Sequence, residues 1–209
     1  MSSAGLVHVI DDDEAMRDSL AFLLAAERFE VVGHDSADSF LETLPSLGFA
    51  CIVTDVRMPG MTGIELLHHM REVDKFLPVI VITGHSDVPL AVEALKAGAF
   101  DFIEKPFDDE RMIAAIRSAL EFRSRAQHQE DSRAEIRTRL DTLTERERQV
   151  FDGLVAGHPN KIIAHDLGIS PRTVEIYRAN VMHKLEASSL SQVVRMAFIV
   201  QGGIDGEVG

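Results

Sequence analysis

Five polar residues stand at points where short apolar runs of this 209-residue chain end. They are Asp11, Asp12, Asp55, Thr83 and Lys105. Runs this short, rich in Val and Ile and separated by helix-length segments, are typical of parallel strands that are buried on both faces. The carboxyl ends of such strands lie along one edge of the sheet, where open α/β folds bind ligands. We therefore expect three carboxylates, one hydroxyl and one ammonium to meet in a single cleft.

The predicted cleft has the chemistry of a phosphoryl site. Oxygen ligands without Cys or His favour a hard cation, Mg²⁺ or Mn²⁺. An ammonium that faces these carboxylates suggests that a phosphoryl group is bound and released there. An Asp after a strand is also a common turn former or helix N-cap. Turn formation alone does not explain five such residues at successive strand ends.

Strand and helix patterns alternate through the first 124 residues. The sequence predicts strands at residues 6–10, 31–32, 50–54, 79–82 and 100–103, and helices at 13–26, from 62, at 86–98 and from 108. This is a (βα)₅ pattern of about 120 residues, a common domain size. The predicted fold class is α/β, a doubly wound parallel sheet, followed by an all-α domain.

Residues 125–141 are highly charged, with few apolar residues and no Gly or Pro. This composition favours a helix over a flexible linker. We predict a helical linker that continues the preceding helix, with room for an interruption at Asp131 and Ser132. The alternative is a disordered coil, because the apolar periodicity is weak.

The remaining residues show only helical patterns. Thr144 and Glu147 form a capping box, in which the two side chains satisfy the free N–H groups of a helix start. Gly168 marks a tight turn, and Ser170 is the expected N-cap of the helix that follows it. A short helix, a Gly turn and a longer capped helix together predict a helix-turn-helix. The predicted helices are 144–157, 160–167, 171–185 and 189–200.

The net charge of −13 belongs to the first half of the chain. Residues 1–124 hold 10 Lys and Arg against 22 Asp and Glu, whereas residues 142–201 hold 7 against 6. The second region can approach a phosphate backbone, although it is no strongly basic patch. We predict three parts: a domain at 1–124, the linker at 125–141 and a DNA-binding domain at 142–205.

The composition also indicates in which cellular compartment the protein is expected. No apolar stretch approaches the roughly 20 residues of a membrane span, and residues 1–5 lack the layout of a signal peptide. The single cysteine, Cys51, lies in a predicted buried strand and cannot form an internal disulfide. These features agree with a reducing cytoplasm.

The motifs resemble those of two known families. The first 124 residues closely resemble the receiver domain of bacterial two-component response regulators, through VIDDD at 9–13, TDVRMPG at 54–60, ITG at 82–84 and FIEKP at 102–106. Residues 142–201 resemble the LuxR/NarL-type helix-turn-helix, through LTERE at 143–147, NKIIA at 160–164 and SPRTV at 170–174. The combination looks like a regulator of nitrogen fixation in rhizobia.

The receiver resemblance implies a role for each cleft residue. It makes Asp55 the acceptor of a phosphoryl group from a histidine kinase, Lys105 the phosphate-binding lysine, and Thr83 and Phe102 the switch residues. Phe102 is also compatible with a core position. A cis Lys105–Pro106 bond is implied as well. The implied Mg²⁺ ligands are Asp11, Asp12, Asp55 and the backbone carbonyl of Arg57.

Helical spacing predicts which face of the recognition helix meets DNA. It places Val174, Tyr177, Val181 and Leu185 toward the core, and Arg172, Glu175, Ile176, Ala179, Asn180 and His183 outward. Glu175 can accept a hydrogen bond from cytosine and Ile176 can touch a thymine methyl, although Glu175 is equally a plain solvated charge. Lys161, Arg178 and Lys184 are expected at phosphates. The expected DNA contacts are Lys161, Arg172, Thr173, Glu175, Ile176, Arg178, Ala179, Asn180 and Lys184.

The resemblance implies a transcription activator that is not an enzyme. Phosphorylation would dimerise it, and the dimer would bind promoter DNA and act on RNA polymerase. Two alternatives stay open. A haloacid-dehalogenase-like phosphatase would use Asp11, Asp13, Thr83, Lys105 and the acidic pair Asp108 and Asp109. A receiver could instead carry a protein- or RNA-binding output domain.

Overall fold

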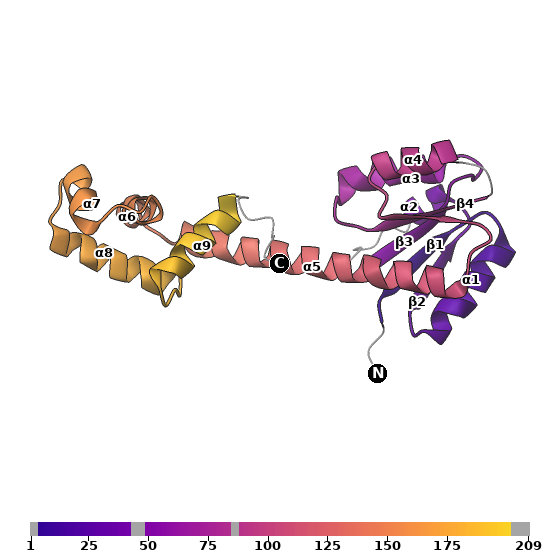
Figure 1. Cartoon of the computed structure of the whole chain (residues 1–209), viewed down its shortest axis with the longest axis horizontal. Coiled ribbons are helices and arrows are strands. Elements are labelled where there is room, and N and C mark those ends of the chain that lie inside the picture. Colours follow the sequence, from indigo (N-terminus) through magenta and orange to yellow (C-terminus); the bar gives the residue numbers. More distant parts are fainter. Residues whose placement is uncertain (1–3, 43–48, 85–87, 202–209) are drawn as a thin grey trace. The chain divides into compact units, whose positions relative to one another are not determined.

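A computed structural model describes residues 4–42, 49–84 and 88–201 of the chain (Figure 1). The chain divides into two compact units, and the boundary in the sequence falls between Gln127 and His128. The first unit contains a parallel sheet, and the described residues of the second form helices and no strand. The predicted combination of an α/β domain and an all-α domain is confirmed.

The sheet of the first unit has five parallel strands in the order β2-β1-β3-β4-β5. The order starts inside the sheet and proceeds outward in both directions, as in a doubly wound fold. The strands are β1 (Leu6–Ile10), β2 (Glu30–His34), β3 (Ala50–Asp55), β4 (Val79–Thr83) and β5 (Asp101–Glu104). Each predicted strand is present, with ends that differ by at most two residues.

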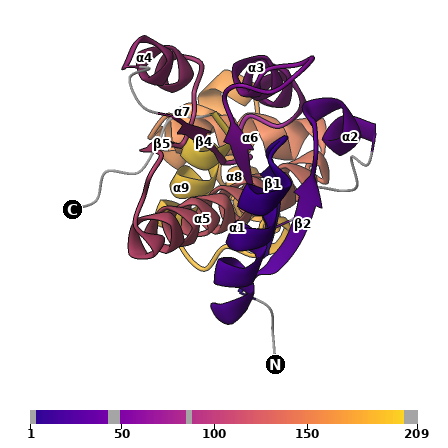
Figure 2. The ribbon, with the colours of Figure 1, turned by 90° about the vertical axis from the view of Figure 1, so that its right-hand side faces the viewer.

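Helices cover both faces of the sheet (Figure 2). One face is covered by α1 (Glu14–Ala26) and the first part of α5 (Asp109–Asp141). The other is covered by α2 (Ala37–Glu42), α3 (Gly63–Val73) and α4 (Val88–Lys96). The sequence analysis did not assign α2, a helix of only 6 residues. The predicted start of α4 at residue 86 lies outside the described residues.

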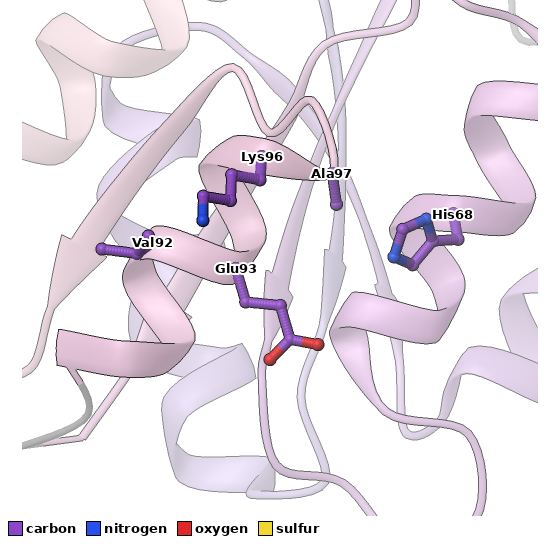
Figure 3. Close-up of a pocket in the computed structure, with 5 residues that line it drawn as sticks. All are labelled: His68, Val92, Glu93, Lys96 and Ala97. Atoms are coloured by element: carbon purple, nitrogen blue, oxygen red, sulfur yellow. The ribbon is translucent and has the colours of Figure 1, made fainter.

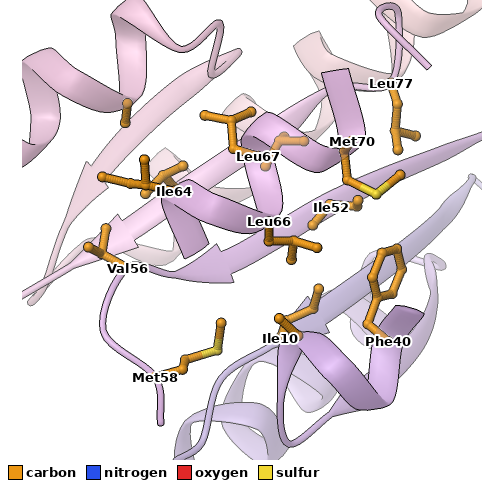
Figure 4. Close-up of a cluster of buried hydrophobic side chains, with 14 of the residues drawn as sticks. Ile10, Phe40, Ile52, Val56, Met58, Ile64, Leu66, Leu67, Met70 and Leu77 are labelled. Carbon is orange, nitrogen blue, oxygen red and sulfur yellow. The ribbon is translucent and has the colours of Figure 1, made fainter. Parts of the chain in front are cut away.

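Neighbouring residues of each central strand enter different cores. In β3, Ile52 packs with residues of α3, whereas Val53 packs with residues of α1 and α5. Side chains alternate between the faces of a strand, so an unbroken apolar run supplies both cores at once. Figure 4 shows Leu66, Leu67 and Met70 of α3 over the strands.

The strand register brings the predicted cleft residues to the same edge. Ile10 pairs with Thr54, Asp55 pairs with Ile82, and Thr83 pairs with Glu104. The residues that follow β1, end β3 and β4, and follow β5 therefore lie side by side. The register explains why positions so distant in sequence can share one site.

The second unit contains the predicted helix-turn-helix. Its helices are α6 (Glu145–Val155), α7 (Asn160–Leu167), α8 (Pro171–Lys184) and α9 (Leu190–Gln201). Thr144 and Glu147 form the predicted capping box, and Ser170 caps α8 by accepting from the Thr173 N–H at 3.1 Å. Gly168 ends α7 with a left-handed φ of 65°, a conformation that favours glycine. Residues 202–205 of the predicted domain lie outside the described residues.

The predicted helical linker is confirmed, and the coil alternative is wrong. Residues 125–141 belong to α5, which continues through Asp131 and Ser132 without a break. Within the second unit, Ile136 and Leu140 of α5 pack in one cluster with Phe151 and Val181. These two apolar residues give the end of the helix a core to join, although its average composition is polar.

Candidate functional site

The ammonium of Lys105 lies between two buried carboxylates at the carboxyl edge of the sheet. Its Nζ donates to Asp55 Oδ1 at 2.6 Å and to Asp11 Oδ2 at 2.8 Å. Asp11 is 2% exposed and Asp55 is 8% exposed. The predicted convergence of these three residues is therefore confirmed, and the two carboxylates share one positive charge.

The second oxygen of each carboxylate is held by the backbone. The Asp13 N–H donates to Asp11 Oδ1 at 2.9 Å, and the Arg57 N–H donates to Asp55 Oδ2 at 2.7 Å. Arg17 donates from α1 to the carbonyl oxygen of Asp11 at 2.8 Å. Both carboxylates are thus fixed in orientation, which is how a protein prepares a nucleophile or a cation ligand.

Opposing effects act on the ammonium of Lys105. Burial lowers its pKa, but the hydrogen bonds and negative charges of Asp11 and Asp55 raise it more, and the net shift is upward. Lys105 therefore stays charged at neutral pH. The peptide bond between Lys105 and Pro106 is cis, as predicted.

The two predicted switch residues lie on β4 and β5. Thr83 is 2% exposed, and its hydroxyl has no hydrogen-bond partner among the residues that the structure describes. A buried hydroxyl without a partner is uncommon and calls for an explanation. Phe102 is half-buried and packs against the core beneath α3 and α4.

The predicted metal ligands are only partly assembled. Asp12 is exposed, next to buried Asp11. Within residues 4–42, 49–84 and 88–201, no three Asp, Glu, His or Cys side chains form a group that could hold a metal ion. Asp11 and Asp55 already face one cation, Lys105, and their oxygens suit a hard ion. The Mg²⁺ site stays a prediction.

Gly63 is a site residue that the sequence analysis missed. A Cβ atom at this position would lie 2.1 Å from the carbonyl oxygen of Asp55. The Gly63 N–H also donates to the carbonyl of Val56 at 3.1 Å. Only glycine allows the start of α3 to approach the end of β3 this closely. A glycine eight residues after Asp55 was a visible signal, but its packing could not be seen in the sequence.

The recognition helix α8 presents the predicted faces. Val174, Val181 and Leu185 are buried and Tyr177 is half-buried. The residues predicted to point outward are all exposed: Arg172, Glu175, Ile176, Ala179, Asn180 and His183. Ile176 keeps 58% exposure. A large apolar side chain in such a position is a feature of binding surfaces, although single cases are common.

The basic residues predicted at phosphates differ in their surroundings. Lys161 and Arg178 line one open pocket at the start of α7, together with His158 and Asn160. Thr173 is half-buried and its hydroxyl pairs with Ser170. Lys184 instead donates to Glu147 Oε2 at 2.6 Å and to the Thr142 carbonyl at 2.9 Å. The ammonium of Lys184 is therefore paired inside the unit, and its phosphate contact stays a prediction.

Another open pocket lies between α3 and α4, away from the carboxyl edge residues (Figure 3). His68 and Glu93 face each other across it, and Val92, Lys96 and Ala97 complete its lining. Its volume is about 330 Å³. None of the predicted site residues lines this pocket.

Two family models match the chain. The response regulator receiver domain matches residues 7–117, and the domain of bacterial regulatory proteins of the luxR family matches residues 141–197. The chain belongs to the response regulator family. This response regulator carries a receiver domain followed by a LuxR-type DNA-binding domain.

Known proteins resemble this response regulator over most of their length. Transcriptional regulatory protein FixJ of Azorhizobium caulinodans is 56% identical over 193 residues, which cover 92% of each chain. Full-length FixJ from B. japonicum, known from crystal structures, is 52% identical with a TM-score of 0.61, covering 96% of this chain and 99% of that one. StyR is 38% identical with a TM-score of 0.81, covering 92% and 97%. The resemblance to rhizobial regulators that the motifs indicate is confirmed.

The family assignment removes the phosphatase alternative for this response regulator. That alternative gave Asp13 a catalytic role, but the Asp13 carboxylate accepts from the Ala15 N–H at 2.9 Å and caps α1. Among the described segments, no helix combines the length and the apolar character needed to cross a membrane.

Proposed function

We propose that this response regulator accepts a phosphoryl group on Asp55 from a sensor histidine kinase and then binds promoter DNA as a dimer. One observation carries the first part: Lys105 Nζ lies 2.6 Å from Asp55 Oδ1, at the edge where the strands of a receiver domain end. The functional parts are proposed to be residues 1–124, 125–141 and 142–205.

Asp55 is the proposed nucleophile. One of its carboxylate oxygens forms a bond to phosphorus while the bond from phosphorus to the histidine nitrogen of the kinase breaks, which yields a mixed anhydride. Lys105 neutralises charge on the oxygens of the transferred group. Asp11, Asp12, Asp55 and the Arg57 carbonyl are the proposed ligands of Mg²⁺. The ion, when bound, offsets the negative charge that develops during transfer.

Thr83 and Phe102 are the proposed switch. A phosphoryl oxygen on Asp55 would give the Thr83 hydroxyl the acceptor that it lacks in the described residues. Such a bond exists in only one state and therefore shifts the population toward that state. Phe102 on β5, beside β4, would move inward as Thr83 shifts.

The proposed dimer forms through the first unit. Val92 and Leu95 of α4 are large apolar residues with 45% and 54% exposure. A second copy of the chain would cover them when the surface of α4, β5 and the start of α5 changes shape. Dimerisation suits the second unit, because paired helix-turn-helix units contact two half-sites.

The exposed face of α8 is proposed to contact bases in the major groove. Arg172, Thr173, Glu175, Ile176, Ala179 and Asn180 supply polar and apolar contacts, and Lys161 and Arg178 contact phosphates. We propose that the protein acts in the cytoplasm as an activator that is not an enzyme and that works with RNA polymerase. The likeness to FixJ supports nitrogen-fixation genes as targets.

The test is incubation with acetyl phosphate and Mg²⁺, followed by intact mass, light scattering and selection of bound duplexes from a random-sequence library. The wild-type protein should gain one phosphoryl group, dimerise and select a two-half-site sequence. Asp55→Asn should do none of these, because an amide has the shape of the carboxylate but not its nucleophilicity. Asp18→Asn, an exposed position on α1, is the matched control. Full phosphoryl uptake by Asp55→Asn would refute the assignment.

A further inference from the structure

The start of α6 contains a buried charged group that the proposed DNA contacts do not use. Glu147 is only 4% exposed. One of its oxygens, Oε2, accepts from the Thr144 N–H at 2.8 Å and from the Thr144 hydroxyl at 3.0 Å. The same atom accepts from Lys184 Nζ at 2.6 Å. The hydrogen bond from Lys184 is the main cause of a lowered pKa for Glu147, which is therefore ionised at neutral pH.

Lys184 is in the last turn of α8, 37 residues away in sequence. Its ammonium also donates to the carbonyl of Thr142 at 2.9 Å. Two of its three protons are thus directed at the segment that begins α6. A charge that is half-covered and paired in this way is poorly placed to reach a phosphate, because it would first have to leave Glu147 buried and unpaired.

The ion pair connects the end of α8 to the start of α6 and can therefore affect the angle of α8. The outward residues Glu175, Ile176 and Asn180 can meet base edges only if α8 keeps its angle to the helices behind it. A 14-residue helix is about 21 Å long, so a tilt of about 10° moves its far end by about 3–4 Å. A shift of that size breaks hydrogen bonds to bases, whereas long flexible side chains can still reach the phosphates.

We propose that Lys184 is a positioning residue, which holds the recognition helix at the angle required for sequence-specific binding through its ion pair with Glu147. The proposal rests on the proposed DNA-binding function of the second unit. In this proposal the ion pair affects the specificity of DNA binding, and Lys184 itself does not contact DNA.

The experiment uses the phosphorylated full-length chain and two probes. The first probe is the duplex that the wild-type protein selects from a random-sequence library, and the second is an unselected random duplex. Dissociation constants are measured at several salt concentrations for Lys184→Met, Glu147→Gln, the double variant and Lys184→Arg. Lys161→Met serves as the phosphate-contact comparison. Thermal unfolding establishes a working temperature at which every variant is folded.

We expect Lys184→Met and Glu147→Gln each to reduce the preference for the selected duplex about tenfold or more. Binding to the random duplex and the slope of log K against log salt should stay unchanged. The double variant should lose no more than either single variant, because both remove the same interaction. Lys184→Arg should retain most of the preference. Lys161→Met should weaken binding to both duplexes alike and reduce the slope of log K against log salt by about 1.

Two outcomes overturn the proposal. The first is a slope reduced by about 1 in Lys184→Met with an unchanged preference in Glu147→Gln, which would make Lys184 a phosphate contact. The second is an unchanged preference in both single variants. Failure of the wild-type protein to select any sequence would instead refute the proposed function itself, so the two failures are distinguishable.

Discussion

Lys105 is the counter-charge of the candidate phosphoryl site. It contacts Asp11 and Asp55, which repel each other and are both buried. An ammonium on a flexible stem can stay near both carboxylates and still follow a phosphoryl group when it arrives. We therefore expect the stability of the first unit and its proposed phosphoryl chemistry to depend on the same three side chains.

Lys105→Met removes this counter-charge. We expect the free energy of unfolding, measured by urea denaturation without divalent cations, to fall by about 1–3 kcal/mol. This is less than the loss for a fully buried ion pair, because Lys105 retains 23% exposure. Lys96→Met, at an exposed position on α4, should have little effect. An equal loss in both variants would contradict the assignment.

Gly63→Ala tests the close approach of α3 to the end of β3. The new Cβ would lie 2.1 Å from the Asp55 carbonyl oxygen, so backbone must move, which we expect to cost about 1–3 kcal/mol. Displacing Asp55 should also slow phosphoryl uptake from acetyl phosphate. Gly33→Ala is the matched control, because its Cβ would make only an ordinary contact of 3.8 Å with Arg17. Unchanged uptake in Gly63→Ala would show that Asp55 tolerates the shift.

At the scale of elements, β1 and β2 are joined by a buried histidine pair. His8 Nδ1 and His34 Nε2 are 3.0 Å apart, and both rings pack edge-on against Phe40 of α2. Burial, aided by His34, lowers the pKa of His8 to about 4. Burial also lowers the pKa of His34.

The sign of the resulting pH dependence follows from these shifts. The unfolded chain takes up protons near its ordinary pKa of about 6.5, whereas the folded chain does so only near 4. The stabilising effect is therefore complete above about pH 6.5 and is lost as the pH falls toward 4. His8 alone accounts for a loss on the order of 3 kcal/mol.

The calorimetric unfolding transition of the first unit in the whole chain, followed from pH 7 to 5, checks this dependence. His8→Gln should show a flatter profile than the wild-type chain. His69→Gln, at an exposed position on α3, should not. A profile for His8→Gln with the wild-type slope would show that the buried pair is not the cause.

The elements were predictable where one local signal dominates. Apolar runs gave the strands, because a parallel sheet hides both faces of each strand and its sequence needs no alternation. Thr144, Glu147 and Ser170 marked helix starts by capping chemistry. The helix α2 was missed because its 6 residues carry too short a pattern.

The candidate site divides in the same way. Asp11, Asp55 and Lys105 were found because each lies at the carboxyl end of a predicted parallel strand, and such ends share one edge of the sheet. Gly63 and the ion pair between Lys184 and Glu147 were missed, because both depend on contacts with residues distant in the sequence. A basic residue near the end of a recognition helix looks the same in sequence whether it faces a phosphate or a buried Glu147.

At the scale of the whole molecule, we propose that dimerisation through the first unit controls DNA binding by the second. Leu95→Asp on α4 should abolish the dimer that forms after acetyl phosphate treatment, because it places a charge in a surface that a second copy must cover. Phosphoryl uptake should remain. Val73→Asp is the matched control, since Val73 of α3 has the same 54% exposure. Light scattering measures both variants, and dimerisation of Leu95→Asp would place the interface elsewhere.

The hydroxyl of Thr83, which lacks a hydrogen-bond partner within the described part of the chain, limits how far a new bond to it can shift the molecule between two states. A missing hydrogen bond of this kind is worth about 1–3 kcal/mol, which is about a 5- to 150-fold shift between two states. A shift from one active molecule in a hundred to ninety-nine requires about 5.5 kcal/mol. A bond to Thr83 would supply only part of this difference, and in the proposed mechanism contacts between copies supply the remainder. The output of the regulator would then depend on its own abundance as well as on the kinase, and a cell that makes more of it would show leakier basal expression.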